Sequence, residues 1–396
     1  KNMTSGFSNN QTFMTGNGLT DFEINGGGGS GEVVQPDTPE EPEISVPSAT
    51  FNDGVTLSWD DLKLTKNGTK YGYIATGISN TSIGSNAFQN CTSLTKIIIP
   101  DEVQSIGSMT FKNCTNLTNA ILPKSITTIT RDLFYGCSSL TNIIIPEGVT
   151  SLAKNSFRDC SSLVKVTLPK TLQTLGDYAF EGCTGIQEVY YNGELEDYLK
   201  VQFRESPESN PMKYGSKLYI NNVLVTSLVI PETCTSIGLF LFQNCKDLTS
   251  VVLHDNVTTI GFAAFSGCTN LVYVDFGESV QTIQKSAFDS CVNLSNIVLP
   301  NSVITIGANA FYGCNLKEVT LPANLVKIEQ NAFNTCDHIY VLSTNPCEIS
   351  AYPFGLISTM LTIHVPQESL ELYQSAWQGR LYRYGTSQII VATEQN

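Results

Sequence analysis

The chain has 396 residues, of which only 15% are charged and 41% are apolar. Soluble proteins usually carry about a quarter charged residues, and so apolar a composition supports a sizeable core and excludes a mainly disordered chain. The formal net charge of -14 argues against nucleic acid as a partner, because phosphate recognition requires positive charge. No run approaches about 18 consecutive apolar residues, so no membrane span is expected.

The first part of the chain differs in composition from the rest. It begins at Lys1 rather than Met, which is typical of a processed or trimmed fragment. Residues 1–25 have sparse apolar content and match no structural element, whereas residues 26–47 contain a glycine tract followed by Glu and Pro. That composition predicts a flexible and then semi-extended linker. Residues 48–82, which include the run Val55–Trp59, are expected to form an N-terminal cap.

An internal repeat organises residues 83–191 and 228–342. Within each block a cysteine recurs every 23 residues, the last one residue early, and a phenylalanine stands three positions before each. The repeated cysteines are Cys91, Cys114, Cys137, Cys160, Cys183, Cys245, Cys268, Cys291, Cys314 and Cys336. Ten copies of one phrase identify a repeat protein, so the chain is expected to form one extended domain behind its linker.

The repeat unit reads I-G-x-x-A-F-x-x-C-x-x-L-x-x-I-x-I-P. Its L-x-x-I-x-I portion alternates with period two and predicts a short strand that the following proline ends. The A-F-x-x-C portion is too short for a free-standing helix, so we expect a single helical or 3₁₀-like turn. Stacked copies predict a right-handed leucine-rich repeat solenoid of about 23-residue coils, with a parallel β-sheet on one face, these turns opposite and a cap at each end.

Residues 192–227 interrupt the repeat as an insert. Apolar runs on either side of Asn221 and Asn222 predict a β-hairpin, because asparagine tolerates positive φ. An irregularity in a regular array often carries function, so the insert side chains Tyr198, Arg204 and Tyr214 are candidate binding residues. The insert is equally consistent with a loop that has no ligand.

Residues 343–396 leave the repeat and are expected to form the C-terminal cap. Solenoids need caps because an open end exposes core and strand edge. The only two tryptophans, Trp59 and Trp377, lie in the two end segments, which favours cap packing over a ligand site.

The phrase A-F-x-x-C-x-x-L-x-x-I-x-I-P at this interval resembles the BspA-like subfamily of leucine-rich repeat proteins. The resemblance covers about residues 50–370, and the insert and the ending around Val365 and Trp377 are similar to recurring modules of that family. Such proteins are mostly secreted or surface proteins of anaerobic bacteria, with relatives in parasitic protists, and are associated with adhesion. The resemblance therefore implies an extracellular or cell-surface location and a protein or cell-surface macromolecule as partner.

The cysteine ladder has two interpretations. Adjacent coils could bring cysteines within disulfide distance, but side chains stacked in parallel do not face one another, which favours small buried hydrophobes. Cys234 is expected to fill a valine position in the same way, while Cys336 and Cys347 form an off-interval pair whose bridging stays open. Without C-x-x-C pairs, and with histidines scattered at His254, His338 and His364, no metal or cofactor is expected.

Sequence motifs give no support for catalysis. There is no H-E-x-x-H, G-x-S-x-G or P-loop motif, and the acidic clusters are interpreted as solvated turns, so the chain is expected not to be an enzyme.

The outward face of the sheet is the main candidate for binding. If Ile97 and Ile99 point inward, then Ile98 and its equivalents point outward. Three successive isoleucines would form an apolar stripe about 10 Å long, although β-branched residues also simply favour strands. The candidate ligand-binding residues on this face are Ile98, Ile121, Ile144, Tyr190, Tyr273 and Asp275.

Three functions are compatible with this sequence. The favoured one is non-enzymatic binding or adhesion through the sheet face or the insert. The alternatives are a structural spacer that presents another domain and a glycan-handling module. Neither the ligand nor the oligomeric state follows from the sequence.

Overall fold

The computed structural model describes most of the repeat region and parts of the two ends. The described residues are 48–50, 56–58, 82–92, 94–99, 101, 103–204, 206–355, 361–381 and 389–392. Residues 1–25, the linker at 26–47, most of the expected N-terminal cap and Trp59 lie outside them. The chain divides into two compact units: residues 1–193 with 206–211, and residues 194–205 with 212–396.

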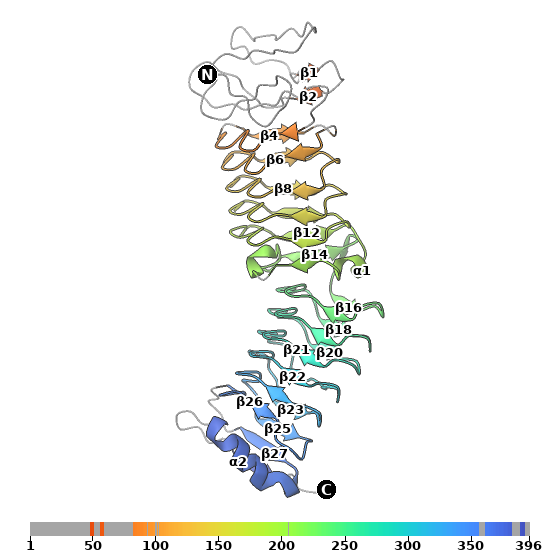
Figure 1. Cartoon of the computed structure of the whole chain (residues 1–396), viewed down its shortest axis with the longest axis vertical. Helices are drawn as coiled ribbons and strands as arrows, with labels where there is room; N and C mark the ends of the chain where they lie inside the picture. Colours follow the sequence, from red (N-terminus) through yellow and green to blue (C-terminus); the bar gives the residue numbers. More distant parts are fainter. Residues whose placement is uncertain are drawn as a thin grey trace. The chain divides into compact units, whose positions relative to one another are not determined.

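The first unit is a stack of coils that each contribute one strand to a parallel sheet. Neighbouring strands pair in register at the repeat interval, so that Ile98 lies opposite Ile121 and Thr167 opposite Tyr190. The strands of this sheet that belong to the first unit are β4 (Lys96–Ile98), β6 (Asn119–Ile121), β8 (Asn142–Ile144), β10 (Lys165–Leu168) and β12 (Glu188–Tyr191) (Figure 1).

Each coil of this unit also carries a second, two-residue strand, and one further hairpin lies near the N-terminus. The second strands are β3 (Ser82–Ile83), β5 (Ser105–Ile106), β7 (Thr128–Ile129), β9 (Ser151–Leu152) and β11 (Thr174–Leu175). β1 (Ser48–Thr50) pairs antiparallel with β2 (Thr56–Ser58), and η1 (Pro207–Ser209) is a 3₁₀ turn.

The second unit repeats this plan after a short irregular entry. The entry contains α1 (Leu195–Tyr198), β13 (Gln202–Phe203), β14 (Lys217–Ile220) and β15 (Val223–Leu224). β14 and β15 are antiparallel, and Asn221 and Asn222 between them adopt φ of 48° and 62°.

The coils of the second unit carry two series of parallel strands, and one long helix lies near the C-terminus. The first series is β16 (Ser227–Val229), β18 (Ser250–Val252), β20 (Tyr273–Asp275), β23 (Glu318–Leu321), β25 (His338–Val341), β27 (Thr362–Val365) and β28 (Ile389–Ala392). The second is β17 (Ser236–Ile237), β19 (Thr259–Ile260), β21 (Thr282–Ile283), β22 (Thr305–Ile306), β24 (Lys327–Ile328) and β26 (Glu348–Ile349). η2 (Gln367–Ser369) leads into α2 (Leu370–Leu381).

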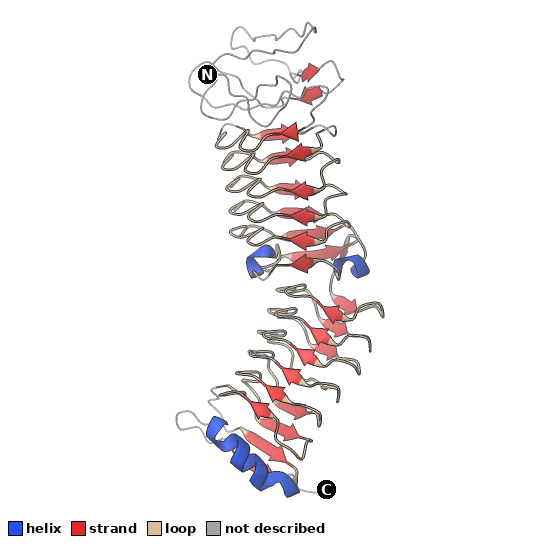
Figure 2. Ribbon diagram, in the orientation of Figure 1, coloured by secondary structure: helices blue, strands red, loops and turns tan. Residues whose placement is uncertain are grey.

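These coils confirm the leucine-rich repeat solenoid. Along β4 the burial alternates as predicted, since Ile97 and Ile99 are buried and Ile98 is partly exposed. The A-F-x-x-C segments are turns rather than regular helices (Figure 2). Asn86 and Asn90, on either side of Phe88, adopt φ of 63° and 62°, which interrupts any helix.

The turn segments form a ladder of their own between coils. The N–H of Cys91 donates to the carbonyl of Phe88 within the coil at 3.1 Å, as in a 3₁₀-type turn. The N–H of Phe88 instead donates to the carbonyl of Thr110 in the next coil at 2.8 Å. The left-handed residues therefore let alternate N–H groups point along the solenoid, so that both sides of each coil are hydrogen-bonded to the next.

The core is a column of stacked phenylalanine rings. In the first unit successive ring centroids from Phe88 to Phe180 lie 5.3–5.5 Å apart, with interplanar angles of 8–13°. The rings from Phe242 to Phe333 repeat this at 5.2–5.5 Å in the second unit. Aromatic pairs add about 0.5–1.5 kcal/mol each beyond burial, so the column ties every coil to its neighbour.

The repeated cysteines are buried and free, as predicted for small core residues. Several of their thiols also donate a hydrogen bond to a phenylalanine carbonyl in the preceding coil, as Cys114 does to Phe88 at 3.0 Å. Cys234 departs from the prediction: it is only partly buried, and its thiol donates to the carbonyl of Ser236. Cys336 and Cys347 are both free thiols.

Helix α2 packs its aromatic residues against the last coils of the second unit. Trp377 is buried and its indole N–H donates to the carbonyl of Cys347 at 3.0 Å, while Tyr373 donates to the carbonyl of Ser343 at 2.9 Å. The two rings meet edge to face at 4.8 Å. This is the packing role predicted for Trp377. No helix among the described residues has the length and apolarity needed to cross a membrane.

Candidate functional site

The outward face of the first unit's sheet presents two parallel columns of side chains. The first column begins each strand and is polar: Lys96, Asn119, Asn142, Lys165 and Glu188. The second column follows two residues later and consists of Ile98, Ile121, Ile144, Thr167 and Tyr190. Because neighbouring strands lie about 4.8 Å apart, each column is an unbroken line of adjacent side chains.

The isoleucines of the second column are exposed to solvent. Ile121 is 49% exposed and Ile144 66%, while Ile98 is partly exposed. Parallel sheets are usually covered on both faces, so an uncovered face with three adjacent isoleucines is an apolar surface of the kind that marks interaction sites.

Tyr190 closes the apolar stripe and is held in place by two charged neighbours. The Lys165 ammonium lies 3.9 Å from the centre of its ring, and its hydroxyl donates to the Glu188 carboxylate at 3.3 Å. A cation over an aromatic ring contributes about 0.5–1 kcal/mol at exposed sites. These contacts restrict the ring before any ligand arrives, which lowers the entropy that binding must offset.

The other two sheet-face candidates belong to the second unit. Tyr273 and Asp275 are both exposed on β20, but they stand in different columns, opposite Ser250 and Val252. The Asp275 carboxylate accepts from the N–H of Gly277 at 3.1 Å and so helps to form the turn after its strand. The two candidates therefore share one strand but not the continuous stripe of the first unit.

The three insert candidates have different environments. Tyr198 is only 2% exposed; its hydroxyl donates to the carbonyl of Leu241 at 2.9 Å, and its ring packs against Phe242. It is a core residue, so its selection as a ligand residue was wrong. Arg204 and Tyr214 are both exposed, and the Lys213 ammonium lies 5.6 Å from the centre of the Tyr214 ring.

A histidine pair on the second unit's sheet face escaped the sequence-based search. His338 on β25 and His364 on β27 lie together, with Nδ1 of the first 3.1 Å from Nε2 of the second. The ring of Tyr340 stacks on His364 at 4.5 Å. Partial burial and the neighbouring His338 lower the pKa of His364. The description of the three histidines as scattered is therefore wrong for these two.

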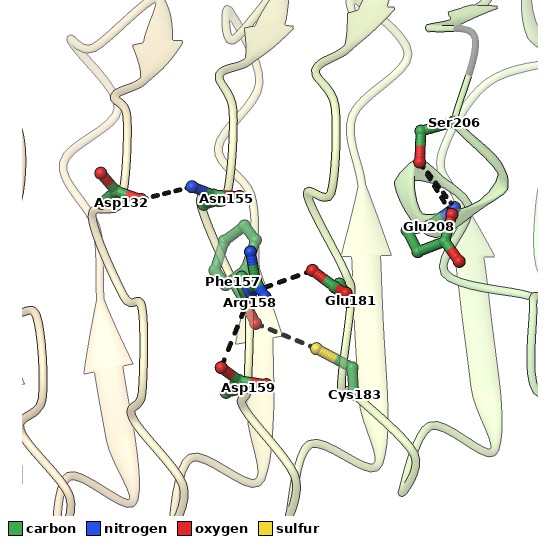
Figure 3. A network of polar contacts seen from close by, with 9 residues as sticks. All are labelled: Asp132, Asn155, Phe157, Arg158, Asp159, Glu181, Cys183, Ser206 and Glu208. Carbon is green, nitrogen blue, oxygen red and sulfur yellow. Dashed lines mark hydrogen bonds and ion pairs between the residues drawn. The ribbon is translucent and has the colours of Figure 1, made fainter.

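A network of polar contacts lies on the turn side of the first unit (Figure 3). Asn155 donates to the Asp132 carboxylate at 2.8 Å. Arg158 lies between Glu181 at 2.9 Å and Asp159 at 3.7 Å (Figure 3). Because both carboxylates are paired with Arg158 and Glu181 belongs to the next coil, we assign this network to the cohesion of neighbouring coils.

Among the described residues, no group of three or more His, Cys, Asp and Glu side chains is placed to hold a metal ion. Two acidic residues of the insert have local partners: Glu194 accepts from the amide of Asn221, and Asp197 pairs with Lys200.

Comparison with known proteins places the repeats in a family. The model of the BspA type leucine rich repeat region matches residues 81–208 and 213–340, well over half of the chain. No curated protein matches the chain in sequence.

Several solved structures resemble the chain. One is a leucine-rich repeat protein from Bacteroides ovatus, with 22% identity, a TM-score of 0.49, and coverage of 90% of this chain and 100% of that one. A leucine rich cell surface protein from Faecalibacterium prausnitzii has 23% identity, a TM-score of 0.45, and coverage of 77% and 96%. The pneumococcal vaccine antigen PcpA has 15% identity, a TM-score of 0.50, and coverage of 84% and 88%, a likeness of fold alone. With its phrase repeated in both units, the chain belongs to the BspA type leucine-rich repeat family.

Proposed function

We propose that this chain is a non-enzymatic binding protein of the cell surface, whose partner is a host protein or another macromolecule displayed on a cell. The observation that carries the proposal is the uncovered stripe of Ile98, Ile121 and Ile144 beside the restrained ring of Tyr190. Membership of the BspA type family supports a surface location.

The chemistry of the stripe suits a protein partner. Fully burying one isoleucine contributes about 1.5–3 kcal/mol, so three adjacent side chains and a tyrosine can supply a compact hot spot. The polar column alongside begins with Lys96 and ends with Lys165 and Glu188 on neighbouring strands, and it provides a charged rim. An apolar centre with a polar rim is the usual anatomy of a protein interface.

The backbone of this face is also preorganised for binding. Every strand is hydrogen-bonded to its neighbours in register, and the phenylalanine column fixes the coils from behind. Binding of a partner would therefore cost little conformational entropy in the surface that it covers. Repeat proteins commonly use such extended faces for binding.

The test is to replace Ile98, Ile121 and Ile144 together by serine. We expect binding to a panel of immobilised extracellular-matrix proteins and to intact epithelial cells to fall at least tenfold, with the far-UV circular dichroism spectrum unchanged. The matched control replaces Val229 and Val252, on β16 and β18, together with Val298, which lies outside the strands and is 79% exposed.

The proposal assigns binding to the isoleucine stripe of the first unit and not to exposed apolar residues in general. Equal losses in the two triple variants would indicate general surface adhesiveness and would contradict it. If the wild-type chain bound no protein and no cell in the panel, a structural spacer would be the better explanation.

A further inference from the structure

We propose that His338 and His364 form a binding site for a divalent transition-metal ion of the nickel, copper and zinc class. The site lies on the outward sheet face of the second unit, and it goes beyond the binding function proposed for the first unit. Imidazole nitrogen is a preferred ligand of these metals, and two imidazoles are already oriented toward one another here.

The distance between the two nitrogens fits joint coordination. His338 Nδ1 and His364 Nε2 are 3.1 Å apart. With metal–nitrogen bonds of about 2.05 Å, that separation corresponds to an angle of about 98° at the metal. This value lies between the cis angle of an octahedral or square-planar ion, about 90°, and the tetrahedral angle, about 109°. Both rings can therefore bind one ion once each turns so that its lone pair leaves the line between the two nitrogens and points at a shared position.

The protein holds these rings in place without a metal. β25 and β27 are paired in parallel, with His338 opposite Thr362 and Tyr340 opposite His364. Tyr340 stacks on the ring of His364 at 4.5 Å with an interplanar angle of 12°. A ring restrained in this way loses less rotational freedom when it coordinates an ion.

Coordination by both rings requires one change of tautomer. In the present hydrogen bond one ring nitrogen donates and the other accepts. Coordination requires a lone pair from both, so the donating ring takes its other tautomer by proton exchange with water. The exchange moves a proton between the two nitrogens of one ring, so it leaves the net charge of the protein unchanged.

The surroundings favour a cation and leave it accessible. His338 is exposed, Asp337 precedes it, and Glu318 lies opposite it on β23, with Lys317 as the nearby opposing charge. Since no third protein ligand is in place among the described residues, water would fill the remaining coordination positions. The geometry therefore defines an open two-histidine site, not a closed structural one.

The experiment uses the full chain without a histidine tag. Nickel binding is measured by isothermal titration calorimetry, and the imidazole signals are followed by NMR as substoichiometric Ni²⁺ broadens those of its ligands. The chain has only three histidines, so the third, His254, is an internal control; it lies 3.4 Å from Glu232 instead.

We expect one nickel ion per chain, with broadening of the His338 and His364 signals first. His338→Asn and His364→Asn should each weaken binding tenfold or more, and His254→Asn should leave it unchanged. The proposal is overturned if the wild type binds no nickel, if neither substitution weakens binding, or if His254→Asn has an equal effect. Unchanged circular dichroism spectra exclude misfolding as the cause of any loss.

Discussion

The thiol of Cys183 donates to the backbone carbonyl of Phe157 in the preceding coil at a distance of 3.0 Å (Figure 3). The same bond recurs between Cys160 and Phe134 at 3.1 Å. The cysteine is thus small enough for the coil corner and also supplies a donor that links two coils. Alanine or valine at this position could not supply that hydrogen bond.

Replacing Cys160 by alanine should lower the free energy of unfolding by about 1–2 kcal/mol, because it removes a buried hydrogen bond and leaves a small void. The carbonyl of Phe134 keeps its bond from the N–H of Cys137, so the cost stays moderate. Urea unfolding followed by circular dichroism measures the change. The control Cys234→Ala, at a partly exposed site, should change stability by less than about 0.5 kcal/mol; a larger loss there than at Cys160 would contradict the assignment.

The native thiols should be nearly unreactive. Burial raises the pKa of Cys336 and of Cys347 to about 12, so at pH 8 only about one molecule in ten thousand carries the reactive thiolate at either position. Titration with Ellman's reagent should detect at most the partly exposed Cys234 and Cys347 in the native protein, and all 12 cysteines after denaturation. Rapid labelling of more than two native thiols would disprove this.

The same thiols predict that stability falls at alkaline pH. Burial raises the pKa of Cys114, Cys137 and Cys268 above the ordinary value of 9.0. Above about pH 9 the unfolded chain releases these protons while the folded chain retains them, so the unfolded state gains stability as pH rises. Below pH 9 both the folded and the unfolded state keep these protons, so the thiols do not make the free energy of unfolding depend on pH. Urea midpoints measured under reducing conditions should therefore drop from pH 9 to pH 10, and a rise over that interval would show that these thiols are not buried.

The left-handed positions of the turns can be tested with two glycines. Gly182 has φ of +75°, and an added Cβ would overlap Oδ1 of Asp159 and lie 3.2 Å from the Cα of Asp159. Gly148 has φ of +101°, but its nearest contact would be 3.8 Å away. Gly182→Ala should destabilise by about 2–4 kcal/mol, because backbone strain and a clash combine, whereas Gly148→Ala should cost about 1–2 kcal/mol from strain alone. Equal thermal stabilities for the two variants would contradict the crowding at Gly182.

The fold was predictable because one phrase is repeated ten times. The alternation around Ile97 predicted which side chains point inward. The stacking of identical units predicted that equivalent side chains of successive coils are neighbours. The two left-handed residues of each turn were not predictable, since the positions of Asn86 and Asn90 hold different residue types in other coils, such as Tyr178 and Gly182. Only the stacked coils show that these positions share one conformation.

The candidate site was predictable only where the interval is regular. His338 lies opposite Thr362 after 24 residues and opposite Glu318 after 20, so a count of 23 never aligns His338 with His364. Tyr198 lies in an insert with no repeat to compare, and its partner Leu241 follows 43 residues later. These contacts could not be predicted because the residues that form them are not separated by the repeat interval.

Tyr190 and Tyr198 are both candidate binding residues by sequence, but replacing them by alanine should affect stability and binding differently. Tyr198→Ala removes a buried ring from Phe242 and leaves the carbonyl of Leu241 without its donor, so we expect a loss of about 3–5 kcal/mol in stability. Tyr190→Ala removes a partly exposed ring from the surface, so stability should change by less than about 1 kcal/mol. In the binding panel, Tyr190→Ala should weaken attachment at least fivefold, because the restrained ring is part of the proposed hot spot. Tyr190→Phe keeps the ring below Lys165 and should retain most of the binding; if Tyr190→Ala bound as well as wild type, the stripe would have to act without its aromatic end.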